Sequence, residues 1–185
     1  MPKVGQTLTD KFSGDSFEFL ETGESTNGEQ VKLKISLKSQ GRTVDDHIHL
    51  AQDETFEIIS GRLTYLLNGE KHYLNAGEKI VLPKNKAHNH YNTDADPVVY
   101  YQTISPAYDI DYFIENLFGL INDGKLKKGN LSFLQAMVTG KYLDSPSRLA
   151  SIPRGPQNFL INILGPIARL FGYRAIYKKY TGIEK

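Results

Sequence analysis

The chain of 185 residues carries 22 Lys and Arg against 21 Asp and Glu, which gives a formal net charge of +1. A near-neutral chain lacks the basic surface that a phosphate backbone requires, so we do not expect nucleic acid as a partner. The chain has no Cys, which excludes disulfides and thiolate metal sites. No apolar run approaches the ~18 residues of a membrane span, and MPKVGQTLTD lacks the pattern of a secretory signal, so we expect a cytoplasmic location.

The charge is distributed unevenly along the chain. Residues 1–105 carry 11 Lys and Arg against 15 Asp and Glu, whereas residues 106–185 carry 11 against 6. The first part therefore has a net charge of −4 and the second a net charge of +5. The pattern of apolar and polar residues also changes near Ser105 and Pro106. We therefore expect two structurally different parts that meet there.

Residues 1–105 contain short strand patterns separated by turns. In VKLKISLK (residues 31–38), apolar and polar residues alternate as in a strand with one solvated face. RLTYLLNGEKHYL contains Asn68-Gly69, the pair preferred in a type I′ hairpin turn. EKIVLP, AHNHYN and PVVYYQTI are further strand candidates. Short, evenly spaced strands without helical patterns between them predict an antiparallel sandwich or barrel.

Two of the five His residues lie one residue apart in DDHIHLAQDETFEIISG (residues 45–61). Side chains two apart in a strand share a face, so both imidazoles of His47 and His49 can reach one point. If Glu54 opens the next strand, it shares its inward face with two apolar side chains, and Glu57 points outward. A carboxylate in an apolar interior needs compensation, which a metal cation held together with two His would supply.

Residues 106–185 have a helical period. In DIDYFIENLFGLIND the apolar residues follow an i, i+3, i+4, i+7 stripe, and Gly124 is placed to end the helix. A shorter helix is predicted from Leu131 to Thr139, starting at Asn130 and stopped by Gly140. DSPSRLASIPRGP, with three Pro, is predicted to be a loop. QNFLINILGPIARLFGY is predicted to form two helical pieces broken at Gly165-Pro166.

The spacing of residues 41–92 resembles the two motifs of the cupin superfamily. The first motif matches at Gly41, His47, His49, Glu54 and Gly61, and the second at Gly77, Pro83, His88 and Asn92. One position departs, because Asn85 stands where the family usually has Gly. Asn tolerates a left-handed backbone better than most residues, so we expect the turn to be kept.

The resemblance implies a mainly β fold: a jelly-roll (cupin) β-barrel over residues 1–105, followed by a C-terminal α-helical extension over residues 106–185. It also implies that His47, His49, Glu54 and His88 bind one divalent transition metal, which this ligand set allows to be Mn, Fe, Ni, Co, Cu or Zn. The alternative is a cupin that keeps the motif without a metal. A homodimer is likewise implied only by the resemblance.

Other polar residues near the motifs have less specific interpretations. His90 shares a strand face with His88, and we assign it to the second shell or the cavity lining, as we do Asn92. His72 follows the hairpin turn and is predicted to be an exposed strand residue. On the last strand, Tyr100, Tyr101 and Gln102 alternate between faces, and the sequence does not decide which parity faces the cavity.

Fold and metal ligands leave the reaction open. The first hypothesis is a small-molecule oxidoreductase of dioxygenase type, in which Glu54 is catalytic and accepts a substrate proton. The alternatives are a redox-neutral Lewis-acid isomerase or epimerase, and a non-enzymatic, metal-dependent binding module. In all three cases the partner is a small molecule.

The helical extension has three interpretations. Its apolar stripes can pack on the barrel or across a dimer interface, which we favour. Alternatively, it can cover the barrel mouth as a lid. The third and least favoured interpretation is contact of the basic tail with an anionic membrane surface, which the predicted break at Gly165-Pro166 weakens.

Overall fold

The computed structural model describes residues 1–41, 44–126 and 131–185 of the chain. Its strands are β1 (Thr7–Thr9), β2 (Ser16–Glu21), β3 (Val31–Leu37), β4 (His47–His49), β5 (Asp53–Ser60), β6 (Arg62–Leu67), β7 (Glu70–Asn75), β8 (Lys79–Leu82), β9 (His88–Asn92), β10 (Val98–Ser105) and β11 (Ser147–Leu149). Its helices are α1 (Ile110–Asn122), α2 (Phe133–Tyr142), α3 (Arg154–Leu170) and α4 (Lys178–Thr181).

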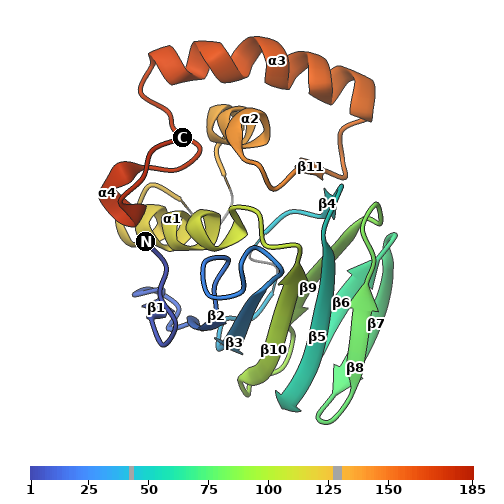
Figure 1. Ribbon diagram of the computed structural model, residues 1–185. Coiled ribbons are helices and arrows are strands. Elements are labelled where there is room, and N and C mark those ends of the chain that lie inside the picture. Colours follow the sequence, from blue (N-terminus) through green and yellow to red (C-terminus); the bar gives the residue numbers. More distant parts are fainter. Residues whose placement is uncertain (42–43, 127–130) are drawn as a thin grey trace.

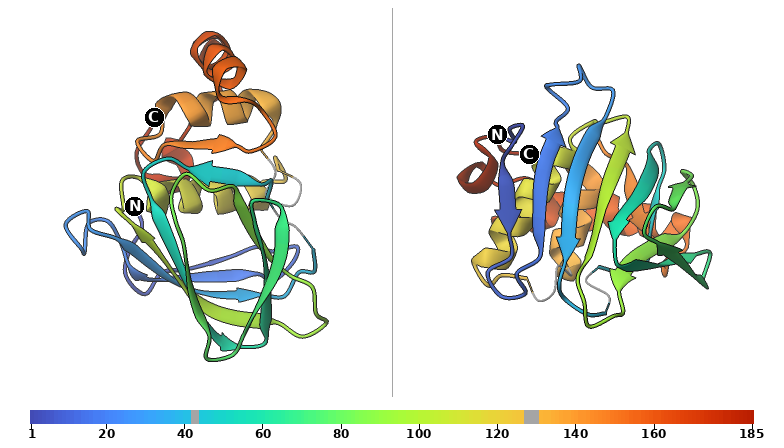
Figure 2. Two further views of the ribbon diagram at one scale, coloured as in Figure 1. Left: turned by 90° about the vertical axis from the view of Figure 1, so that its right-hand side faces the viewer. Right: turned by 90° about the horizontal axis from the view of Figure 1, so that it is seen from below.

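The strands form two antiparallel sheets. One has the order β1-β2-β3-β10-β5-β8 and the other the order β11-β4-β9-β6-β7. The sheets face each other, and the helices stack above one end of them with α3 outermost (Figures 1 and 2). The predicted jelly-roll barrel with C-terminal helices is confirmed, while the proposed division at residue 105 stays a prediction.

The alternation predicted for the strands places the core between the two sheets. Val31, Leu33 and Ile35 of β3 are fully buried, as the pattern of that strand requires. On β5, Phe56 and Ile58 are buried on the same face as Glu54, whereas Glu57 is exposed and lies 3.5 Å from the Lys79 ammonium. The inward parity of β5 is therefore confirmed.

The turn residues adopt the conformations that their types predict. Asn68 and Gly69 have φ values of 51° and 86°, as a type I′ turn between β6 and β7 requires. Asn85 has a φ of 64°, so Asn does provide the left-handed conformation at the position where cupins usually have Gly. Its backbone N–H donates to the carbonyl oxygen of His49 over 2.7 Å, which fixes this turn against β4.

Helix α1 has the predicted extent, and Gly124 follows its end with a φ of 71°. Helix α2 is displaced from its prediction. It begins after Ser132, whose side chain accepts a hydrogen bond from the Gln135 backbone, while the predicted start, Asn130, lies outside the described residues. Gly140 does not stop this helix: it lies inside α2 and makes room for Ile161 of α3, because a Cβ there would lie 2.9 Å from Ile161 Cδ1.

The predicted break at Gly165-Pro166 is wrong, because α3 continues through both residues. Pro166 removes the N–H that would bond to the Asn162 carbonyl, but both residues are exposed, so water can satisfy that oxygen. Gly165 is buried where α3 crosses α2, and a Cβ there would lie 2.9 Å from Lys141 Cβ. Close packing on α2 thus outweighs the local preference for a break.

The segment predicted as a loop, residues 144–156, contains β11 and the first turn of α3. β11 pairs with β4 and extends the five-stranded sheet, with Ser147 opposite His49 and Leu149 opposite His47. Such an edge pairing depends on long-range hydrogen bonds rather than on local pattern. The C-terminal part of the chain is therefore joined to the barrel through backbone pairing.

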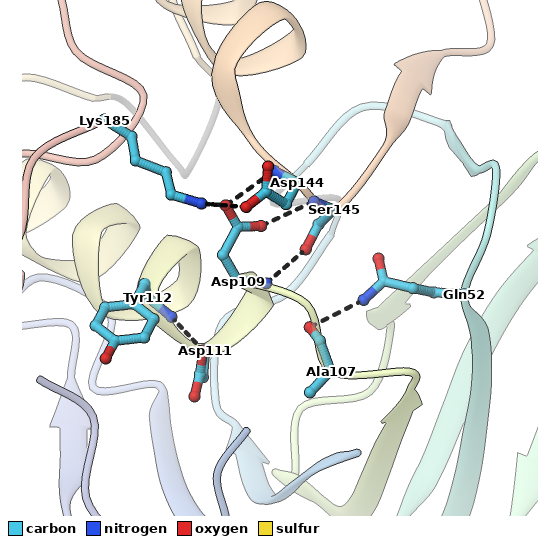
Figure 3. Close-up of polar contacts among 8 residues, drawn as sticks. All are labelled: Gln52, Ala107, Asp109, Asp111, Tyr112, Asp144, Ser145 and Lys185. Atoms are coloured by element: carbon cyan, nitrogen blue, oxygen red, sulfur yellow. Dashed lines mark hydrogen bonds and ion pairs between the residues drawn. The ribbon is translucent and has the colours of Figure 1, made fainter. Parts of the chain in front are cut away.

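The buried carboxylate of Asp109, at the start of α1, connects α1 to the segment after α2 and to the C-terminal residue. Asp109 accepts hydrogen bonds from the backbone N–H groups of Asp144 and Ser145, over 2.9 and 2.8 Å, and from Lys185 Nζ over 2.8 Å (Figure 3). Burial alone would raise the pKa of Asp109, but these donors outweigh it and lower the pKa. Nearby, Gln52 Nε2 donates to the Pro106 carbonyl oxygen over 2.8 Å, which ties α1 to the barrel.

The positions of two glycines give a stability test. A Cβ on Gly61, whose φ is 78°, would lie 2.8 Å from the Pro97 carbonyl oxygen, whereas Gly69, with φ 86°, has no atom within 4 Å of such a Cβ. In urea denaturation, we expect Gly69→Ala to lower the free energy of unfolding by about 1 kcal/mol and Gly61→Ala by about 3 kcal/mol. Equal losses would show that the contact with Pro97 does not constrain Gly61.

Candidate metal centre

Four side chains from three strands and both sheets converge in the barrel interior. β4 presents His47 and His49 on one face, and its pairing with β9 places His88 opposite His47. Glu54 comes from β5 in the facing sheet. One donor atom from each of His47, His49, Glu54 and His88 lies within 4.8 Å of the others, so the cluster could hold a metal ion.

Backbone carbonyl groups orient two of the imidazoles. Nδ1 of His47 lies 2.9 Å from the Asp45 carbonyl oxygen, and Nδ1 of His88 lies 3.0 Å from that of Lys86. A carbonyl can only accept, so each Nδ1 carries a proton, and in the neutral ring the lone pair lies on Nε2. This is the arrangement that a metal-binding His requires.

Three of the four side chains are buried and His47 is half-buried, and the hydrogen-bonding capacity of the cluster is incompletely used. Glu54 is 2% exposed and His88 1% exposed. His49 Nε2 lies 3.0 Å from Glu54 Oε1, and His88 Nε2 lies 3.4 Å from Oε2. Neither approach has the alignment of a hydrogen bond, so both His49 nitrogens, Glu54 Oε2 and His88 Nε2 are buried without a partner. Buried polar atoms without partners in three of the four side chains indicate that a bound cation would complete the site, as a divalent transition metal held by one donor atom from each residue would.

The electrostatics of the cluster favour an ionised carboxylate. Burial opposes the charge on Glu54, but His49 and His88 outweigh it and lower its pKa well below the usual value. Burial also opposes the charge on His88, yet Glu54 raises the pKa of His88 overall. Burial and the neighbouring His49 lower the pKa of His47 to about 4, so His47 is a neutral ligand at physiological pH.

The other residues singled out in the sequence lie around this cluster rather than in it. The His90 ring packs 4.7 Å from the Phe56 ring and 5.9 Å from the Tyr100 ring, and its Nδ1 is buried without a partner. The Asn92 amide is occupied in a turn, where it donates to the Asp96 carbonyl oxygen and accepts from the Asp94 N–H. His72, predicted to be exposed, is half-buried because it stacks on Tyr65, and its side chain is 41% exposed.

The structure also shows which residues of the last barrel strand, β10, face the interior. Tyr100 is fully buried and Gln102 is 5% exposed, so both face the interior. Tyr101 points to the other side, where the Lys32 ammonium lies 5.1 Å from the centre of its ring. Sequence alone could not assign these faces, because β10 has apolar or aromatic residues at both parities.

The cluster opens into a chamber of about 810 Å³ between the barrel and the helices. His47, His49, Glu54 and His90 line it on the barrel side, and side chains of α1, α2, β11 and α3 line it opposite. Its apolar walls include Phe17, Ile104, Phe113, Leu117, Met137 and Ile161. The helical extension therefore packs on the barrel, with Ile110, Ile114 and Phe118 of α1 in the same core as the strands, and lies over the cluster. A role as a lid stays a prediction. Of these wall residues, only those in the apolar stripe of α1, such as Phe113 and Leu117, had a signal in the sequence.

The family comparison agrees with this geometry. Residues 34–104 match the family described as Cupin domain. Together with the two facing sheets and the His and Glu cluster, this match shows that the chain contains a domain of the cupin superfamily. A search of curated proteins found no match to the sequence.

Several solved structures resemble the chain at low sequence identity. KdgF from Halomonas sp. is 17% identical with a TM-score of 0.46, and the alignment covers 55% of this chain and 87% of that one. A cupin-superfamily sugar phosphate isomerase from Silicibacter pomeroyi is 17% identical with a TM-score of 0.47, covering 56% and 75%. A sugar phosphate isomerase described as putative, from Acidithiobacillus ferrooxidans, is 16% identical with a TM-score of 0.44, covering 50% and 60%. These likenesses do not indicate a substrate for this chain.

Removing two ligands tests the assignment of the metal centre. We expect His47→Ala/His49→Ala to abolish bound metal in protein purified without added metal, because half of the donor set is lost. His72→Ala, at an exposed strand position, is the matched control and should keep the metal content of the unaltered protein. Metal is measured by plasma mass spectrometry and folding by circular dichroism. Stoichiometric metal in the folded double variant would refute the assignment.

The pKa shifts predict how the metal-free protein responds to acid. Burial lowers the pKa values of His47 and His90 from 6.5 to about 4 in the folded chain. Between these values the unfolded chain binds more protons, so the free energy of unfolding should fall as pH drops from 6.5 to about 4. Each group contributes roughly 1 kcal/mol per pH unit.

The raised pKa of His88 does not alter the slope between pH 6.5 and 4. His88 adds its full stabilisation of the folded state below the pKa of the unfolded chain, and this stabilisation is lost only at higher pH. Urea denaturation of chelator-treated protein at several pH values measures the slope. His90→Phe should reduce it by about half, since one of the two groups is removed. A stability that stays constant from pH 6.5 to 4 would contradict the burial of these neutral imidazoles.

Proposed function

We propose that the protein is a metal-dependent oxidoreductase of dioxygenase type that acts on a largely apolar molecule carrying adjacent oxygen atoms. The observation that carries this proposal is the three-His, one-Glu cluster at the wall of a mainly apolar chamber of about 810 Å³. A chamber of this size is in the range of small-molecule sites, in which a few polar groups orient a ligand held mainly by apolar contacts.

The chamber lining favours an apolar substrate over a sugar phosphate. Among the described residues that line it, Arg148 is the single Lys or Arg. A phosphate dianion beside a single Arg would keep uncompensated charge, which is costly to bury. An aromatic or aliphatic body suits Phe113, Leu117 and Met137, while its oxygen atoms face the cluster.

His47, His49, Glu54 and His88 would hold the metal, and a redox-active ion such as Fe or Mn would supply Lewis acidity and electron transfer there. Glu54 is the proton acceptor in this proposal, because it is the carboxylate of the cluster and its Oε2 has no hydrogen-bond partner. The apolar walls exclude water from the reacting atoms.

The test compares two glutamates on one strand. Glu54→Gln removes the proton acceptor, and Glu57→Gln, on the exposed face of β5, is the matched control. Aromatic molecules with adjacent hydroxyl or keto groups, and sugar phosphates for contrast, are first screened for stabilisation of the metal-loaded protein against heat. With a molecule so selected, we expect oxygen uptake per bound metal to fall about hundredfold in Glu54→Gln and to be unchanged in Glu57→Gln.

The same assay distinguishes the other two functions. Product formation under strict anaerobiosis would replace the proposal with redox-neutral isomerisation. Stabilisation by a small molecule without turnover would replace it with a binding module. Undiminished oxygen uptake in a metal-replete Glu54→Gln variant would remove Glu54 from the role of proton acceptor.

A further inference from the structure

Helix α3 is the outermost element of the molecule and contacts the rest of it through one face (Figures 1 and 2). That inner face carries the buried Gln157, Gly165 and Ala168, and it packs on α2. Gln157 and Ile161 of the same face line the chamber. An amphipathic helix that packs in this way normally turns a polar face to solvent.

The outer face of α3 carries an apolar stripe instead, beside the exposed Asn158 and Asn162. Phe159, Ile163, Ile167 and Leu170 are spaced by four, four and three residues, so they lie on one face of the helix. Their exposed fractions are 66, 44, 42 and 86%, and Phe171, directly after the helix, is 76% exposed. Single exposed apolar residues are ordinary, but a continuous stripe along a whole helix marks an interaction surface.

The surroundings of this stripe are basic. Residues 145–183 contain six Lys and Arg and no Asp or Glu. Arg154 is exposed at the start of α3, Lys141 Nζ lies 2.6 Å from Asn162 Oδ1 beside the helix, and Arg169 stacks on Tyr142. Within the described parts of the chain, none of these three cations lies within ion-pair distance of a carboxylate. Their charge is therefore available to an anionic partner.

We propose that the outer face of α3 docks on the surface of a bilayer containing anionic lipids. The helix would lie parallel to the membrane, with the stripe in the boundary between headgroups and acyl chains and the basic side chains at the lipid phosphates. Such a helix lies on the bilayer rather than across it: among the described residues, no helix has the length and apolarity to cross a membrane. The inner face of α3 would then hold the chamber next to the lipid.

A second copy of the chain is a poorer occupant of this face. A twofold interface brings the same patch of both copies together. Here that would bring the basic side chains of both copies, Arg154 and Arg169 among them, into one interface, with no Asp or Glu from residues 145–183 to pair with them. Anionic lipids provide the complementary charge that a second copy lacks.

The test is flotation of the full chain with phosphatidylcholine vesicles, with and without phosphatidylglycerol. We expect binding to the anionic vesicles that weakens with added salt, and little binding to phosphatidylcholine alone. Phe159→Asn/Leu170→Asn should lower the partition coefficient by about tenfold or more, because it removes apolar surface from the stripe. Both side chains are exposed, so we expect the variant to fold.

The matched control is Tyr73→Asn/Val81→Asn, which removes two side chains of 49 and 53% exposure from β7 and β8. These strands lie away from α3 (Figure 1), so the control should float like the unaltered protein. No binding to anionic vesicles, or an equal loss in the control, would overturn the proposal. A dimer in analytical ultracentrifugation that dissociates in Phe159→Asn/Leu170→Asn would assign the face to a second copy instead.

Discussion

The Glu54 carboxylate, buried inside the barrel and facing three imidazoles, is the constraint around which the site is built. An ionised carboxylate in an apolar interior is stable only with compensating charge or hydrogen bonds. Here the compensation comes from His49 and His88 on the facing sheet, at 3.0 and 3.4 Å. The site therefore forms only when the two sheets pack at the distance that brings Glu54 to His49 and His88. Closure of the barrel and formation of the metal centre are one structural event.

The residues around Glu54 are positioned by backbone rather than by other side chains. The carbonyl oxygens of Asp45 and Lys86 set the protonation of His47 and His88. The turn at Asn85 is bonded to the carbonyl oxygen of His49. Because these groups belong to strands and turns of the barrel, the imidazoles keep their orientation without a polar network in the chamber. The chamber can consequently combine the cluster with a largely apolar lining.

Sequence reasoning predicted the barrel and the cluster because their signals are local. Alternation in β3 and β5, the Asn68-Gly69 turn and the two His on one strand face each depend on a few neighbouring residues. The contribution of His88 came only from its spacing in the family motif, since its partner strand is 41 residues away. The parity of Tyr100 and Gln102 needed the structure, because both parities of β10 carry apolar or aromatic residues.

The errors fall where tertiary packing overrides local preference. Pro166 is a helix breaker by propensity, yet α3 passes through it, since Gly165 packs closely on α2 and Pro166 lies on the exposed side. β11 has no strand pattern of its own and forms because the edge of β4 is open to it. The wall of the chamber opposite the cluster is built from α3 and β11, so no local sequence pattern could have predicted it.

The continuity of α3 also bears on the uneven charge of the two parts of the chain. A helix broken at Pro166 would present two short apolar patches, whereas the continuous helix presents one stripe from Phe159 to Leu170. The barrel part, residues 1–105, has a net charge of −4, and the helical part has +5. Near an anionic surface, such a charge distribution would turn the helices toward the lipid and the barrel away from it before any apolar contact forms. The electrostatic asymmetry and the apolar stripe thus favour the same orientation of the molecule, although they arise from different residues.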